Sequence, residues 1–129
     1  PNTRIAAYYD PDTAAAQAFA EVFPGVEVAR SLDELVNSVD AIWMGDASGF
    51  GEDHFDMIAP ALERGLPTFC DKPIGGTVAG TKKILDFAKQ HQAPLMSGSI
   101  FNYEWGMEAA KRMRGWNSSI GPITARSRH

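Results

Sequence analysis

Residues 67–73 read PTFCDKP, a short apolar run that ends in a charged Asp-Lys-Pro turn. The run lacks the strict alternation of a half-buried strand, which is typical of a strand covered on both faces in a parallel sheet. A helical pattern at residues 54–64 precedes the run and ends at Gly65. A second helical pattern begins at Thr77 and continues to residue 90. A buried strand between two helices predicts a repeating strand–helix fold.

The same alternation extends in both directions along the chain. Strands are predicted at residues 3–9, 26–28, 40–44, 67–70, 94–97 and 120–128. Helices are predicted at residues 14–23, 31–36, 54–64, 77–90 and 103–114. The apolar face of the helix at 77–90 is expected to contain Val78, Ile84, Leu85 and Ala88. This order indicates an α/β domain with a mostly parallel sheet.

Local signals set the expected helix ends. Asp12 or Thr13 can cap the first helix, and Ser31 with Glu34 three residues later fits a capping box. Pro60 lies inside the helical pattern that precedes the PTFCDKP run. Because proline lacks an N–H donor and clashes one turn back, we expect a kink or a broken helix there.

Composition narrows the function classes. The chain has 129 residues, of which 44% are hydrophobic and 22% charged, as in an ordinary soluble domain. Its net charge of −4 and the lack of a basic run argue against nucleic acid as a partner. The sequence contains no 18-residue apolar stretch and no signal-peptide pattern, so we expect no membrane association. A single cysteine, Cys70, excludes a disulfide within the chain and fits a reducing, cytoplasmic setting.

Three polar residues follow predicted strands: Asp10, Asp46 and Lys72. Ligands of parallel sheets bind at the carboxyl ends of the strands. Asp10 can accept hydrogen bonds from a ribose, or it can simply form an Asp-Pro turn. Lys72 can polarise a carbonyl or help a hydroxyl lose its proton, or it can be an exposed lysine in a turn. Pro73 restricts Lys72 to extended backbone, and the bond between them can be cis.

The histidines, the cysteine and the glycines give weaker indications of a functional site. His54, His91 and His129 lack metal-ligand spacing, so no metal site is predicted. His54 starts a predicted helix after a glycine-rich loop, where it can face a ligand, whereas Cys70 is interpreted as a core residue. The glycines of residues 45–51 and 75–80 do not have G-x-G-x-x-G spacing and are interpreted as turns.

Five segments, in this order, resemble the Gfo/Idh/MocA family of NAD(P)-dependent oxidoreductases. They are residues 5–12 (IAAYYDPD), residues 31–42 (SLDELVNSVDAI), residues 61–70 (ALERGLPTFC), residues 71–74 (DKPI) and residues 120–123 (IGPI). The resemblance implies an incomplete, doubly wound Rossmann-like sheet at residues 1–118. It also implies that residues 119–129 begin a second, α+β domain.

The resemblance also implies roles for the matched positions. Lys72 would be catalytic and would lie near the nicotinamide and the reacting substrate oxygen. Asp10 would bind the adenosine ribose, which favours NAD, with NADP as the alternative. The other cofactor-binding positions would be Asp46, Ser48, His54, Asp71 and Pro73. Asp71 is a departure, since the family usually has a glutamate before Lys-Pro.

The family's first strand and its G-x-G-x-x-G turn have no counterpart in the chain. We therefore expect a piece of a longer enzyme, or a truncated relative, in which two inner strands lack a neighbour. Such exposed edges also favour a homo-oligomer. The leading function is oxidation of a hydroxyl group on a sugar, polyol or similar small substrate. The alternatives are a cofactor-free α/β binding or assembly module and, with poorer spacing between Asp46 and Lys72, a phospho-acceptor receiver-like domain.

Overall fold

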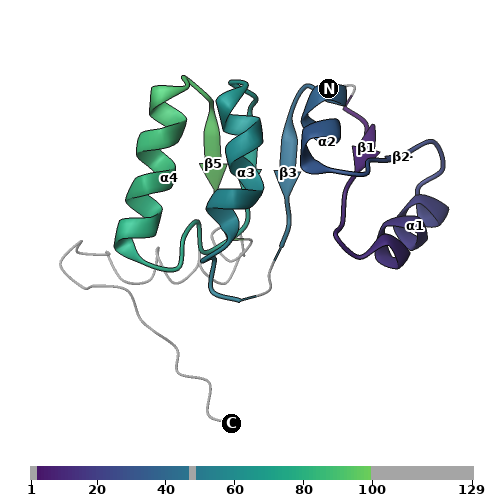
Figure 1. Ribbon diagram of the computed structural model, residues 1–129, viewed down its shortest axis with the longest axis horizontal. Helices are drawn as coiled ribbons and strands as arrows, with labels where there is room; N and C mark the ends of the chain where they lie inside the picture. Colours follow the sequence, from purple (N-terminus) through teal and green to yellow (C-terminus); the bar gives the residue numbers. More distant parts are fainter. Residues whose placement is uncertain (1–2, 47–48, 100–129) are drawn as a thin grey trace, which may run out of the picture. The chain divides into compact units, whose positions relative to one another are not determined.

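The computed structural model describes residues 3–46 and 49–99, and these residues alternate between strands and helices (Figure 1). The elements are β1 (Ala7–Tyr8), α1 (Thr13–Val22), β2 (Glu27–Val28), α2 (Leu32–Ser38), β3 (Ile42–Met44), α3 (His54–Glu63), β4 (Thr68–Cys70), α4 (Val78–Gln90) and β5 (Leu95–Ser97). The strands and helices predicted within these residues are therefore all present. They belong to one compact unit that ends at Gly98.

The strands form two parallel sheets. β1 pairs with β2, and β3, β4 and β5 pair in that order. Within the described residues, β1 and β3 are each paired along one edge, as expected for inner strands that lack a neighbour. The described strands and helices are thus arranged in a Rossmann-like way. The strands are shorter than predicted, because a ladder extends only as far as its partner does.

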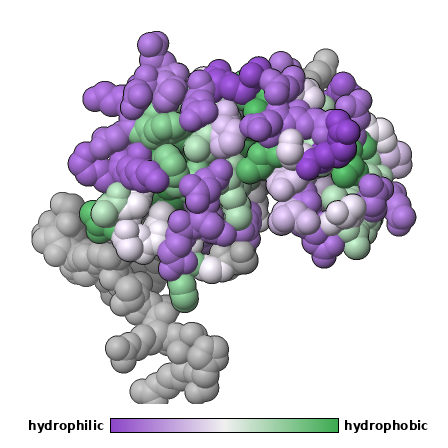
Figure 2. Space-filling view, viewed as in Figure 1, coloured by the Kyte–Doolittle hydropathy of each residue, from purple (hydrophilic) through white to green (hydrophobic). Residues whose placement is uncertain are grey.

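The core lies between α3, α4 and one face of the three-stranded sheet. The large side chains that are fully buried there are Ile58, Leu62, Ile84, His54 and Cys70. Figure 1 shows α3 and α4 running side by side. Trp43, in register with Phe69, lies on the opposite face of the sheet and is 77% exposed. On the described part of the face seen in Figure 2, polar side chains are interspersed with apolar ones.

Side-chain caps begin three of the helices. Asp12 caps α1 by accepting a hydrogen bond from Ala14 N at 2.9 Å. Thr77 caps α4 in the same way. Ser31 caps α2 by accepting from Glu34 N at 3.1 Å, which is half of the predicted capping box. The other half, in which the Glu34 carboxylate would accept from Ser31 N, is wrong. That carboxylate accepts from the backbone and guanidinium of Arg30 instead.

Two further expectations about the helices need correction. α3 is not broken at Pro60. The carbonyl left without a donor belongs to Asp56, an exposed residue, so water can satisfy it. The predicted apolar face of α4 is half wrong, since Ile84 and Ala88 are buried but Val78 is 89% and Leu85 50% exposed. Val78 is the first residue of its helix.

Several predictions fall outside the described residues. These are the helix at 103–114, the strand at 120–128 and the domain boundary between residues 118 and 119. Among the helices of the described part, none is long and apolar enough to cross a membrane.

Candidate functional site

Three polar residues occupy equivalent places after the strands. Asp10 lies two residues past β1, Asp46 two past β3 and Lys72 two past β4. Met44 and Cys70, the last residues of β3 and β4, are register partners. Asp46 and Lys72 therefore leave the same sheet at the same edge, from neighbouring strands. This is the carboxyl edge, where parallel sheets bind ligands.

The carboxylate of Asp10 is held in place by its own segment. Its Oδ2 accepts from the Tyr8 hydroxyl at 3.2 Å, and its Oδ1 accepts from Asp12 N at 2.8 Å. Burial and the bond to Asp10 raise the pKa of Tyr8, so the phenol stays a donor. The Tyr8 ring in turn stacks on Phe19 of α1, with ring centroids 3.9 Å apart. Asp10 thus forms the predicted turn and keeps free lone pairs for a further donor.

Asp46 begins the loop that follows β3. It is half-buried, and its backbone N–H contacts the sulfur of Met44 at 3.4 Å. Ser48, the other predicted residue of this loop, lies outside the described residues. The part of the loop that follows, from Gly49, leads directly into α3.

The Asp-Lys-Pro segment forms a turn at the end of β4. The backbone N–H of Asp71 donates to Met44 O at 3.0 Å, which continues the ladder one residue past the strand. Lys72 N then donates to the Asp71 carboxylate at 2.7 Å. The Lys72–Pro73 peptide bond is cis, and Lys72 is exposed to solvent. The ammonium of Lys72 is therefore reachable by a ligand at the sheet edge.

The loop after β3 and the turn after β4 pack closely on each other. Gly76 N donates to Gly51 O at 3.2 Å. Gly51 has a φ of +80°, and a Cβ built on it would lie 2.7 Å from Pro73 O. A Cβ on Gly76 would lie 2.9 Å from Phe50 O. Glycine is required at both positions because the two backbones leave no room for a side chain.

His54 and Cys70 are buried beneath this contact. His54 is 1% and Cys70 0% exposed, and His54 Nδ1 lies 3.5 Å from Cys70 Sγ. Burial and the nearby Asp71 charge raise the pKa of the Cys70 thiol to about 11, so the thiol is protonated at neutral pH. This agrees with the interpretation of Cys70 as a core residue. His54 is enclosed here, and no surface of its ring faces the open sheet edge.

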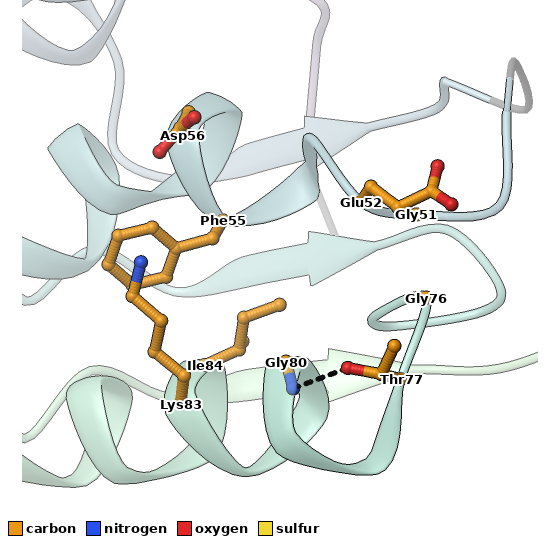
Figure 3. Close-up of a pocket in the computed structure, with 9 residues that line it drawn as sticks. All are labelled: Gly51, Glu52, Phe55, Asp56, Gly76, Thr77, Gly80, Lys83 and Ile84. Carbon is orange, nitrogen blue, oxygen red and sulfur yellow. Dashed lines mark hydrogen bonds between the residues drawn. The ribbon is translucent and has the colours of Figure 1, made fainter.

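A shallow cleft of about 270 Å³ opens between the beginnings of α3 and α4 (Figure 3). Gly51 and Gly76 lie at one end of the cleft, and Lys83 lies at the other, with its Nζ 3.3 Å from the centroid of the Phe55 ring. Of the predicted site residues that the structure describes, none lines this cleft. The cation–π contact gives Lys83 a structural partner, so the cleft adds no group to the candidate site.

Two features of the site were not predicted from the sequence. Tyr8 was assigned to a strand without a role, although residues two apart on a strand project to the same side and so bring Tyr8 to Asp10. Gly51 and Gly76 were interpreted as separate turns. Their mutual contact joins loops from two strand–helix units, and no local pattern reveals it.

Comparison with known proteins identifies the family. Residues 1–99 match the model of the Gfo/Idh/MocA oxidoreductase family with an NAD-binding Rossmann fold. The chain belongs to this family. The resemblance inferred from the sequence is therefore confirmed, and so is the Rossmann-like fold class.

The proteins to which the chain is similar include an oxidoreductase and several inositol 2-dehydrogenases. The chain is 34% identical over 111 residues to an uncharacterized oxidoreductase of Streptococcus pneumoniae, covering 84% of the chain and 29% of that protein. It is 30% identical over 92 residues to inositol 2-dehydrogenase of Corynebacterium glutamicum, covering 70% of the chain and 26% of that protein. The chain thus spans less than a third of the length of these two relatives.

A solved structure supports the fold alone. The structure of myo-inositol 2-dehydrogenase from Lactobacillus plantarum aligns with a TM-score of 0.70 at 23% identity. The alignment covers 86% of this chain and 33% of that one.

Proposed function

We propose that the chain is the cofactor-binding part of an NAD(P)-dependent dehydrogenase that oxidises a hydroxyl group of a polyol, sugar or similar small compound. The observation that carries the proposal is the exposed Lys72, placed two residues past β4 at the carboxyl edge in a Gfo/Idh/MocA chain. The inositol 2-dehydrogenases among its relatives support a polyol as substrate.

The residues at the sheet edge fit a dinucleotide. Asp10 offers a fixed carboxylate after β1, which suits the hydroxyls of an adenosine ribose. Such a carboxylate repels a 2′-phosphate, so we propose NAD over NADP. Asp46, Ser48, Asp71 and Pro73 would border the cofactor from the loops after β3 and β4. His54 is buried, so it would act through one of these loops.

Lys72 would perform the polar part of the reaction. The bound nicotinamide ring supplies the hydride acceptor. The Lys72 ammonium would lie beside the substrate oxygen, where it would stabilise negative charge on that oxygen. Asp71, with its carboxylate on Lys72 N, would keep the turn in the conformation that presents this ammonium.

The test combines binding and turnover. NADH fluorescence should report binding at millimolar concentration or below, and Asp10→Ala should weaken it. In the protein produced from the complete reading frame, Lys72→Ala should lower turnover by at least ~10²-fold. Lys89→Ala, a change at an exposed lysine of α4, is the matched control and should leave turnover unchanged. A near-normal rate for Lys72→Ala would overturn the catalytic role.

Family membership does not favour the alternative of a cofactor-free module. The homo-oligomeric state, the lack of nucleic-acid and membrane partners and the cytoplasmic location stay predictions.

A further inference from the structure

The buried side chains of His54 and Cys70 connect two segments of the site. His54 is the first residue of α3, directly after the loop that contains Gly51. Cys70 is the last residue of β4, directly before the turn that contains Lys72. The two side chains meet at 3.5 Å, from Nδ1 to Sγ. The imidazole and the thiol thus join the ends of two segments that both border the proposed cofactor.

The thiol also contacts the turn itself. Cys70 Sγ lies 3.5 Å from Asp71 O and 4.0 Å from Ile74 O. These two carbonyls flank Lys72 and Pro73. A thiol has one proton, so it can donate to one carbonyl of the turn while it accepts a hydrogen bond from the imidazole. A chain of polar contacts then runs from His54 through Cys70 to the backbone on both sides of Lys72.

The second nitrogen of the His54 imidazole makes no hydrogen bond within the part of the chain that the structure describes. This nitrogen, Nε2, is buried. An unsatisfied buried nitrogen costs stability, and a leucine or methionine of similar size would fill the space without that cost. Its presence therefore indicates that the contact made by the other nitrogen matters for more than packing.

We propose that His54 and Cys70 are positioning residues, which fix the turn at residues 71–76 and so hold Lys72 at the sheet edge. This proposal rests on the proposed dehydrogenase function. Neither side chain is exposed, so both act through the turn backbone and not by touching cofactor or substrate. The contact of Gly51 with Pro73 and Gly76 closes the same turn from the outside.

The first test needs no activity. Amide hydrogen exchange, measured by NMR on the full chain, reports the turn through Gly76 N, which donates to Gly51 O. Cys70→Ala and His54→Leu should each speed exchange of this amide by roughly 10-fold, the effect of losing a hydrogen bond. Cys70→Ser keeps a donor and should restore slow exchange. His54→Asn keeps a polar atom near the place of Nδ1 and should do the same.

The matched control is Ile58→Val, one helical turn after His54 in the same core. It removes a buried methylene but no polar contact, so exchange of Gly76 should stay within about 2-fold of the wild-type rate. If Ile58→Val speeds exchange as much as Cys70→Ala does, the pair has only a packing role and the proposal fails. If His54→Leu does not fold, the comparison of Cys70→Ala with Cys70→Ser decides.

The second test uses turnover in the protein from the complete reading frame. Cys70→Ala should lower kcat by roughly 10-fold with the KM for the dinucleotide nearly unchanged, because the turn presents Lys72 less precisely. Cys70→Ser should recover most of kcat. If Lys72→Ala abolishes turnover but Cys70→Ala behaves like Ile58→Val, the positioning proposal is overturned and the dehydrogenase proposal stands. If Lys72→Ala itself has no effect, the proposed function fails whatever the pair does.

Discussion

The contact between the two loops can be tested by adding one methyl group at Gly51. Gly51→Ala forces a side chain into a residue with a φ of +80° and brings its Cβ to 2.7 Å from Pro73 O. The positive φ alone costs roughly 1–2 kcal/mol for alanine. Relief of the overlap requires the Pro73 backbone to move, and overpacking of this kind costs about 1–3 kcal/mol more. We therefore expect a total loss of roughly 2–5 kcal/mol of unfolding free energy.

Gly25→Ala separates the two contributions. Gly25 has a similar φ of +88°, but a Cβ built there meets no atom within 4 Å. It should cost only the positive-φ component, roughly 1–2 kcal/mol. The difference between the two variants, about 1–3 kcal/mol, measures the steric contact of Gly51 with the turn.

Urea unfolding followed by far-UV circular dichroism suits this comparison. Trp43 fluorescence is a poor probe because the indole is already 77% exposed in the folded protein. Equal destabilisation by Gly51→Ala and Gly25→Ala would refute the close packing of the two loops. The same result would remove the outer support that the structure gives to the Lys72 turn.

Three further predictions concern the core and its edges. Thr77→Ala should cost about 1 kcal/mol in urea unfolding, since Thr77 Oγ1 accepts from Gly80 N at 2.9 Å, whereas Thr77→Ser should cost less. Leu62→Ala should cost about 2–5 kcal/mol in the same assay, because Leu62 is fully buried. Folded Cys70 should react slowly with a disulfide reagent at pH 8. Burial raises the pKa of the Cys70 thiol from 9.0 to about 11, so the unfolded chain loses this proton at lower pH than the folded protein does. The free energy of unfolding should therefore fall as the pH rises from 9 to 11, and Cys70→Ser should reduce that fall.

The sequence was a good guide to the order of elements and a poorer guide to their extent. Caps such as Asp12 and Thr77 act within one turn of backbone, so their residue types predict them well. Strand length depends on the partner strand, which lies elsewhere in the chain. The exposure of Val78 and Leu85 likewise depends on what the rest of the fold places beside α4.

In the candidate site, too, local features could be predicted from the sequence and features set by distant parts of the chain could not. Asp10, Asp46 and Lys72 were predicted because a strand end is a local feature with a known place in a parallel sheet. The burial of His54 could not be read from its position after a glycine-rich loop. It follows from the contact of that loop with residues 73–76, which depends on Gly51 and Gly76 fitting against each other.

The position of Lys72 depends on buried residues that no ligand would touch, as well as on its neighbours Asp71 and Pro73. Its backbone N–H donates to the carboxylate of the neighbouring Asp71, and its side chain is exposed. The register of β3 with β4 fixes where the turn begins, and the Gly51 contact fixes where it folds back. Between these two points lie the buried thiol of Cys70 and the ring of His54. Substitutions of these two buried residues should therefore lower the turnover that depends on Lys72 more than substitutions at exposed positions of α4 do. Exposure to solvent, which Lys72 shares with those α4 positions, does not decide the size of the effect.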